Sequence, residues 1–161
     1  MDSLFCSTLE TPIGKIHIFA NEQYISEITF SEKETEGMVA NQLSNLAAKQ
    51  LEQYFKGELQ QFQIPLQQSG TDFQQEVWQA LMGIGYAETT SYAKFSEHKP
   101  LAIRAIAAAN GKNKLAVVVP CHRVIGSNGK LVGYAGGLWR KKWLLQHESE
   151  TAKKGQTELK F

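Results

Sequence analysis

Cysteine is scarce in this chain: its 161 residues contain only two, Cys6 and Cys121. The two lie far apart, and such a pair does not form the disulfide framework that stabilises small secreted domains. A chain of this length can bury an adequate core without crosslinks. We therefore expect free thiols and a reducing, cytoplasmic compartment.

Long apolar runs and ligand-binding motifs are also missing. No stretch approaches the roughly 20 apolar residues of a membrane-spanning helix, and the N-terminus lacks the layout of a secretory signal. The histidines and cysteines form no CxxC or HxxxH pair, and no GxxxxGK[ST] loop is present. The sequence predicts no export, no membrane anchor, no metal and no cofactor.

Positive charge is unevenly distributed. Residues 1–87 contain 4 Lys and Arg against 11 Asp and Glu, a net charge of −7, whereas residues 88–161 contain 13 against 5, a net charge of +8. A basic half favours a polyanionic partner such as nucleic acid, because phosphate contacts supply most non-specific attraction. By itself, the asymmetry is equally compatible with solvated surfaces.

Periodicity predicts a sheet and then helices. Alternation around Ile18 and an apolar run at residues 24–30 predict a small antiparallel sheet, and helical spacing follows from Met38 to Gly57. Further on, Thr71 and Gln74 form a capping box that opens a helix through about residue 82.

Two short helices come next. Ser91 can cap one helix from Tyr92 to about Glu97, and Pro100 suits the first turn of another. This second helix is predicted to stop at Gly111, because glycine readily adopts the left-handed conformation of a helix cap. Two short helices joined by a tight turn have the outline of a helix-turn-helix.

The most informative segment is Pro120-Cys121-His122-Arg123, which follows the apolar run Leu115–Val119. The β-branched run predicts a buried strand, and proline, which cannot donate to a ladder, should end it. Cys121 would then lie at the rim of a sheet with a histidine beside it. This setting suggests a nucleophile.

A nucleophilic Cys121 needs activation, because only about 3% of a thiol with a pKa near 8.5 is ionised at pH 7. Side chains at consecutive extended positions point to opposite faces, so a turn or a water would have to connect Cys121 to His122. Glu148 or Glu150 could orient the imidazole. On these residues alone, an inert buried cysteine is the more common alternative.

The elements together predict an α+β protein. Residues 1–66 form an N-terminal α/β domain with a small antiparallel sheet. Residues 67–149 form a mainly helical domain that contains the helix-turn-helix and the short strand carrying Cys121, with a last helix ending near Gln146. Residues 150–161 are polar and predicted to be a disordered tail.

The segment from Thr71 to Glu148 resembles the O6-alkylguanine-DNA alkyltransferases, a family of suicide DNA-repair proteins. The N-terminal 66 residues match that family only in layout. The resemblance is carried by Phe73-Gln74-Gln75-Glu76-Val77-Trp78, Ser91-Tyr92, Arg104-Ala105, Asn110 through Asn113, Val119-Pro120-Cys121-His122-Arg123-Val124-Ile125-Gly126, Gly133-Tyr134-Ala135-Gly136-Gly137-Leu138, and Lys141 with Trp143-Leu144-Leu145.

This resemblance implies that Cys121 accepts an alkyl group from O6 of guanine once per molecule, and it leaves open whether O4 of thymine is also a substrate. His122 would deprotonate Cys121 through a water, and Glu148 would orient His122. Asn113 would brace the turn that holds the site. Tyr92 would donate its hydroxyl proton toward guanine N3. The implied partner is double-stranded DNA containing O6-alkylguanine, bound by a monomer without a cofactor.

The resemblance also implies DNA contacts. Arg104, with Ala105 beside it, would fill the gap left by a flipped nucleotide, and Gln74, Ser127 and Tyr92 would also lie at the DNA. An inserted side chain can offset part of the few kcal/mol that flipping costs. From the residues alone, Arg104 could equally be a solvent-reaching side chain on a packed helix. The implied pocket for the base contains Val124, Tyr134 and Ala135.

Departures from the family pattern leave the rigidity of the loops open. The family commonly has a proline and a glycine in the loop before Ser91-Tyr92, where this chain has Ile84-Gly85-Tyr86-Ala87, and Lys114 stands where a proline is usual.

The sequence leaves two other functions open. One is a non-catalytic alkyltransferase-like protein, although known relatives of that kind lack the acceptor cysteine. The other is a cysteine hydrolase, for which no oxyanion motif is evident.

Overall fold

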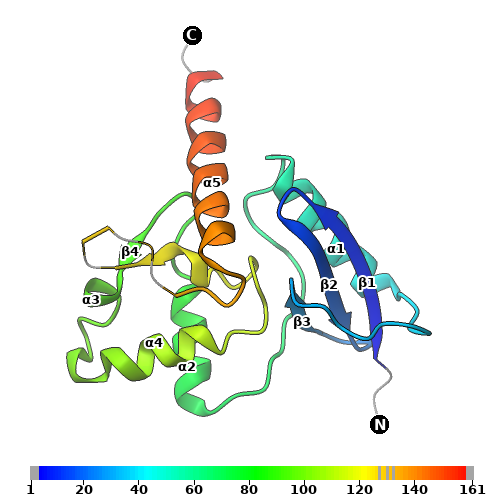
Figure 1. Ribbon diagram of the computed structural model, residues 1–161, viewed down its shortest axis with the longest axis horizontal. Helices are drawn as coiled ribbons and strands as arrows, with labels where there is room; N and C mark the ends of the chain where they lie inside the picture. The colour runs from blue at the N-terminus through cyan, green and yellow to red at the C-terminus, as the bar shows by residue number, and fades with distance from the viewer. Residues whose placement is uncertain (1–3, 127, 130, 132, 159–161) are drawn as a thin grey trace. The chain divides into compact units, whose positions relative to one another are not determined.

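The computed structural model describes residues 4–126, 128–129, 131 and 133–158, which form two compact units (Figure 1). The first unit comprises the residues up to Ser69 together with Lys114–Val118, and the second comprises Gly70–Asn113 and the residues from Val119 onward. Lys114–Val118, predicted as part of the C-terminal domain, therefore belongs to the first unit.

The first unit contains a three-stranded antiparallel sheet in the order β1-β2-β3, as the alternation predicted. Its strands are β1 (Phe5–Thr11), β2 (Gly14–Ala20) and β3 (Ile25–Thr29). The helix α1 (Gln42–Phe55) packs on β1 and β2 through apolar side chains that include Leu51. It begins later than Met38 because the Asn41 side chain accepts a hydrogen bond from the Ser44 N–H at 2.8 Å and caps the helix there.

The predicted strand Leu115–Val119 is wrong. Only Leu115 bridges a strand, at Ile28 of β3, and residues 116–118 form a turn in which Val117 has a φ of +69°. The apolar run is nevertheless buried, with Leu115, Val117, Val118 and Val119 each at most 4% exposed. Burial thus explains the run of apolar residues without requiring a strand.

The second unit begins with the predicted capping box, in which the Gln74 N–H donates to Thr71 Oγ1 and the Thr71 N–H donates to Gln74 Oε1. Strands β4 and β5 pair in parallel. The elements are α2 (Asp72–Leu81), β4 (Thr90–Ser91), α3 (Tyr92–Phe95), η1 (Pro100–Ala102), α4 (Ile103–Gly111), η2 (Cys121–Arg123), β5 (Val124–Ile125) and α5 (Leu138–Glu158).

Two predicted helix ends in this unit are wrong. Gly111 is not a left-handed cap; it lies within α4, and Lys112 is the right-handed C-cap. The helix α5 continues past Gln146 to Glu158 and includes most of the predicted disordered tail. Glutamate, alanine and lysine, which are common there, favour helix even where no apolar face is buried. Among the described residues, no helix is both long and apolar enough to cross a membrane.

Substitution by alanine should change the stability of the second unit in opposite directions at Gly70 and at Gly111. A Cβ at Gly70 would lie 2.4 Å from the ring of Trp78, which is 4% exposed and fixed by a hydrogen bond from Nε1 to the Ala109 carbonyl. Gly70→Ala should therefore destabilise the second unit by about 1–3 kcal/mol. A Cβ at Gly111 meets nothing within 4 Å, so Gly111→Ala should be neutral or stabilise by up to about 1 kcal/mol.

Urea unfolding followed by tryptophan fluorescence measures this difference. All three tryptophans, Trp78, Trp139 and Trp143, lie in the second unit, so the signal reports on it specifically. Equal midpoints for the two variants would contradict the packing argument.

Candidate active site

Cys121 lies in a tight turn, the 3₁₀ turn η2, and not at the end of a strand. With three residues per turn, consecutive side chains of a 3₁₀ helix diverge by about 120°. The strand β5 follows at once and pairs with β4, with Thr90 opposite Val124, so Tyr92 begins α3 close to the cysteine. A turn of the kind needed to relate Cys121 to His122 is therefore present.

Cys121 opens into a pocket of about 580 Å³. A volume of this size lies in the range of sites that enclose a small organic molecule. Of the residues singled out in the sequence, Tyr92, Arg104, Cys121, Tyr134 and Ala135 line it together. Sequence reasoning gave no role in the site to five further lining residues, Ile103, Ala107, Asn110, Gly111 and Gly133.

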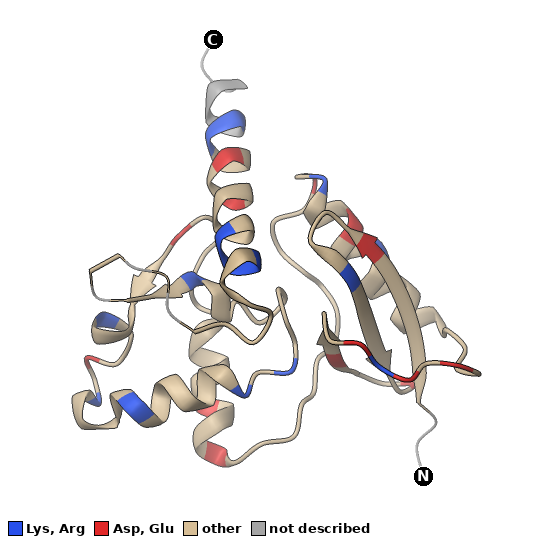
Figure 2. Cartoon of the chain, viewed as in Figure 1, with Lys and Arg blue, Asp and Glu red and all other residues tan. Residues whose placement is uncertain are grey.

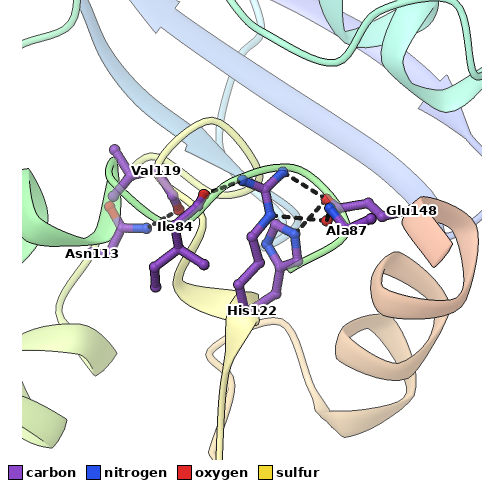
Figure 3. Close-up of polar contacts among 7 residues, drawn as sticks. Ile84, Ala87, Asn113, Val119, His122 and Glu148 are labelled. Carbon is purple, nitrogen blue, oxygen red and sulfur yellow. Dashed lines mark hydrogen bonds and ion pairs between the residues drawn. The ribbon is translucent and has the colours of Figure 1, made fainter. Parts of the chain in front are cut away.

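A fully buried carboxylate, that of Glu148 on α5, lies against His122 (Figure 3). Its Oε2 accepts hydrogen bonds from His122 Nε2 at 2.7 Å and from Arg123 Nη2 at 3.0 Å. Its Oε1 accepts from Arg123 Nε at 2.8 Å and from the Ala87 N–H at 3.2 Å. Glu148 is therefore the residue that orients His122, whereas Glu150, the alternative, is exposed.

Arg123 is a site residue to which sequence reasoning gave no role, although it stands in the Pro-Cys-His-Arg string. Besides its two bonds to Glu148, it donates from Nη1 to the Ile84 carbonyl at 2.8 Å. The loop 84–87 is thus held at both ends, by Arg123 at Ile84 and by Glu148 at Ala87. These bonds restrain the loop whose rigidity the sequence left open.

Burial and hydrogen bonding set the protonation of the site. Burial raises the pKa of the Cys121 thiol, with Asn113 and the charge of Lys141 acting in the opposite direction. Burial lowers the pKa of His122, so the imidazole is neutral at pH 7. Burial alone would raise the pKa of Glu148, but the hydrogen bonds from His122 and Arg123 and the positive charge of Arg123 outweigh it and hold the pKa well below its usual range.

These pKa directions fix the role of each imidazole nitrogen. Because an ionised Glu148 faces Nε2, that nitrogen of the neutral His122 carries the proton. Nδ1 is then the acceptor, and it is buried without a hydrogen-bond partner among the described residues. The site therefore contains a protonated thiol and a neutral imidazole whose basic nitrogen, Nδ1, accepts no hydrogen bond from the described residues.

Asn113 makes the contacts expected of a brace. Its Nδ2 donates to the Val119 carbonyl at 3.1 Å and lies 3.5 Å from Cys121 Sγ. Asn113 and Val119 are the residues at which the chain leaves and re-enters the second unit. The amide therefore joins these two points and positions the sulfur at the same time.

Lys141 is a buried cation beside the pocket. Its Nζ donates to the Val124 carbonyl at 2.6 Å and to the Gly133 carbonyl at 3.3 Å. Val124 itself is fully buried and does not line the pocket. Its carbonyl is thus engaged by Lys141, which connects β5 to the segment leading to Tyr134.

Two of the predicted DNA-contacting residues do not line the pocket. Gln74 is half-buried in the capping box of α2, and Ala105 is exposed on α4. Ser127 lies outside the described residues. Figure 2 shows lysine and arginine on α3, on α4 and between them, where Lys94, Lys99 and Arg104 occur.

No metal site is formed by the part of the chain that the structure describes. Within it, no three histidine, cysteine or carboxylate side chains gather closely enough to hold an ion. The predicted absence of a metal stays a prediction.

Replacing Glu148 by glutamine should destabilise the second unit at pH 7 by about 3–5 kcal/mol, because it leaves the buried Arg123 without a counter-charge. The pKa of Glu148 is lower when folded than the ordinary value near 4.3, so its contribution is present above about pH 5 and is lost as the pH falls. The difference in free energy of unfolding between wild type and variant should therefore narrow by up to about 1.4 kcal/mol per pH unit below pH 5.

Urea midpoints at pH 7, 5 and 4 test this prediction, with Glu150→Gln on the same helix as the matched control. The control should follow the wild-type protein at every pH. If Glu148→Gln lowered the stability by the same amount at every pH, the predicted link between the Glu148 pKa and stability would be contradicted.

Two family models match this chain, one over each of its two parts. The model of the family described as 6-O-methylguanine DNA methyltransferase, DNA binding domain, matches residues 72–150. The model of the ribonuclease-like domain of the same family matches residues 4–68.

Similar proteins extend over nearly the whole chain. Methylated-DNA–protein-cysteine methyltransferases of Methanosarcina barkeri and Mycobacterium leprae are 43% and 42% identical over 90% of this chain, and the matches cover 97% and 92% of those proteins. The crystal structure of the O6-methylguanine methyltransferase of Mycobacterium tuberculosis matches with a TM-score of 0.82 at 39% identity, covering 92% of this chain and 94% of that one. A structure of the Mycobacterium tuberculosis protein OGT in complex with DNA matches with a TM-score of 0.81 at 40% identity, covering 89% and 92%. This chain belongs to the 6-O-methylguanine DNA methyltransferase family.

Proposed function

We propose that the protein repairs double-stranded DNA by moving an alkyl group from O6 of guanine to Sγ of Cys121. The bond between the alkyl carbon and O6 breaks as the bond between that carbon and sulfur forms. The thiol proton is lost and the departing guanine gains one, so the reaction is balanced without a cofactor. The product is a thioether that water does not reverse, so each molecule reacts once.

The observation that supports this function most directly is that Cys121 lines a pocket that can hold a base and is followed in the same turn by His122, a neutral imidazole hydrogen-bonded to Glu148. The raised pKa of the thiol means that a base must remove its proton before attack. His122 Nδ1 has the required lone pair, and a single water between Nδ1 and Sγ would carry the proton. His122 acts as the base, and Glu148 stabilises the imidazolium that forms.

Tyr92 is the proposed proton donor to the base. It borders the pocket, and burial raises its pKa, so the hydroxyl is protonated at neutral pH. Protonation of guanine N3 removes negative charge from the leaving base and lowers the barrier. Tyr134 and Ala135 also line the pocket.

Access to the base requires that the nucleotide leave the duplex, because O6 within a stacked helix cannot reach a buried thiol. Arg104 is exposed on α4 and also lines the pocket. It is the proposed finger that takes the place of the flipped nucleotide, with α3 and α4 acting as a helix-turn-helix. Lys94 and Lys99 on and after α3 supply positive charge for the phosphates.

The alternatives from the sequence are less consistent with this site. A non-catalytic DNA-binding relative does not need the thiol, which here is directed at the pocket. A hydrolase needs direct transfer from Cys121 to His122, and no hydrogen bond joins these two side chains among the described residues. Action as a monomer in the cytoplasm, where the DNA would be encountered, stays a prediction.

Counting transferred methyl groups tests the function. Incubation with duplex DNA containing labelled O6-methylguanine should label the protein to a plateau of one methyl per molecule, and Cys121→Ser should take up none. Cys6→Ser, which changes the other buried cysteine, should behave like the wild-type protein. Continuing turnover, or a plateau unaffected by Cys121→Ser, would exclude the mechanism.

The role of Arg104 has a separate test. Arg104→Ala should slow methyl transfer from duplex DNA by at least tenfold, because the gap in the stack is no longer filled. It should leave the reaction with free O6-benzylguanine within about twofold, because a free base needs no flipping. Lys142→Ala, at an exposed position on α5, is the matched control for loss of one positive charge. Equal losses on both substrates would show that Arg104 is not the finger.

A further inference from the structure

Asn110 is a buried polar residue of the pocket to which sequence reasoning gave no role. It lies near the end of α4, is 4% exposed, and lines the pocket together with Tyr92 and Cys121. Its Nδ2 donates a hydrogen bond to the Tyr92 hydroxyl oxygen. Its Oδ1 is buried and has no hydrogen-bond partner among the described residues. A buried amide is costly unless its hydrogen bonds are used, so this position calls for an explanation.

The hydrogen bond from Asn110 decides what the Tyr92 hydroxyl can do. A phenol oxygen can accept a hydrogen bond and also donate its own proton. The amide N–H of Asn110 occupies the accepting side, so the O–H proton of Tyr92 is left to be donated elsewhere. Both side chains border the pocket, and the available partner in that space is a bound base.

The same bond affects how readily the proton is given up. Negative charge develops on the Tyr92 oxygen as its proton moves to the base, and a hydrogen bond from an amide N–H stabilises that charge. In the resting protein this bond already opposes the rise in pKa that burial causes at Tyr92. Asn110 therefore favours the state of Tyr92 in which the proton has been transferred.

We infer that Asn110 is a positioning residue for alkyl transfer: its amide N–H directs the Tyr92 proton at the bound base and stabilises the oxygen that loses it. The inference rests on the proposed function, since it needs Tyr92 to be the donor. It also depends on the orientation of the amide. With Oδ1 turned toward Tyr92, the amide would accept the hydroxyl proton and compete with the base.

A double-mutant cycle tests the coupling between the two residues. Single-turnover rates of methyl transfer from duplex O6-methylguanine are measured for wild type, Asn110→Leu, Tyr92→Phe and the double variant. Asn110→Leu should slow transfer roughly tenfold, and Tyr92→Phe at least as much. If Asn110 acts through Tyr92, the double variant should be within twofold of Tyr92→Phe. A double variant slowed by the product of the two single effects would overturn the inference.

Two controls exclude a merely structural effect. The reaction of Cys121 with iodoacetamide, whose iodide leaving group needs no proton, should be unchanged within twofold by Asn110→Leu. Loss of this reaction would show a general disturbance of the site and overturn the inference. If Asn110→Leu does not fold, as judged by its urea midpoint, Asn110→Ala is used in the same cycle with the same expected outcomes.

Asn110→Asp tests the orientation of the amide. An ionised carboxylate can only accept, so this variant should be slower than Asn110→Leu at neutral pH. Its rate relative to the wild-type rate at the same pH should recover on acidification, when the carboxyl group can again donate. A variant as fast as wild type at neutral pH would mean that no donor is needed at this position. A wild-type protein that transfers no methyl group would instead refute the proposed function itself.

Discussion

The second unit depends on one buried ion cluster, the carboxylate of Glu148 with the side chains of His122 and Arg123. A buried carboxylate is tolerable only if its oxygens are fully hydrogen-bonded, and Glu148 accepts four bonds. Those bonds come from the cysteine-bearing turn and from Ala87. The cluster that orients the base is therefore also the one that fixes the loop 84–87 and α5 to the turn. Activity and stability of this unit depend on the same charges.

This cluster shows why only part of the site could be predicted. The capping box at Thr71 uses a neighbour three residues away, so local sequence was enough to locate that helix start. The Pro-Cys-His-Arg string likewise points to Cys121, which lines the pocket, although the sequence placed this residue at the rim of a sheet and not in a turn. Arg123 reaches Ile84 across 39 positions and Asn110 reaches Tyr92 across 18, and such contacts exist only once the unit has folded.

The wrong predictions have physical causes of the same kind. An apolar run reports burial, and Leu115–Val119 is buried, but burial does not distinguish a strand from a turn. The left-handed backbone at Val117 is disfavoured for a β-branched residue and has no signal in the sequence. At α5, an absence of apolar residues suggested disorder, whereas helix propensity is sufficient to continue a helix already anchored by buried residues such as Leu144.

A protein that reacts once must keep its nucleophile unreactive until the right substrate arrives, and the burial of Cys121 provides this. Burial raises the pKa of the thiol, so the resting sulfur is a poor nucleophile toward small electrophiles in solution. In the proposed mechanism, the groups that promote attack act on the proton transfers at either end of the displacement: His122 would take a proton from sulfur, and Tyr92 would give one to the base. Only a substrate that brings both an alkyl carbon to the sulfur and a basic nitrogen to Tyr92 engages both groups. Selectivity then comes from the coupling of two proton transfers across one pocket.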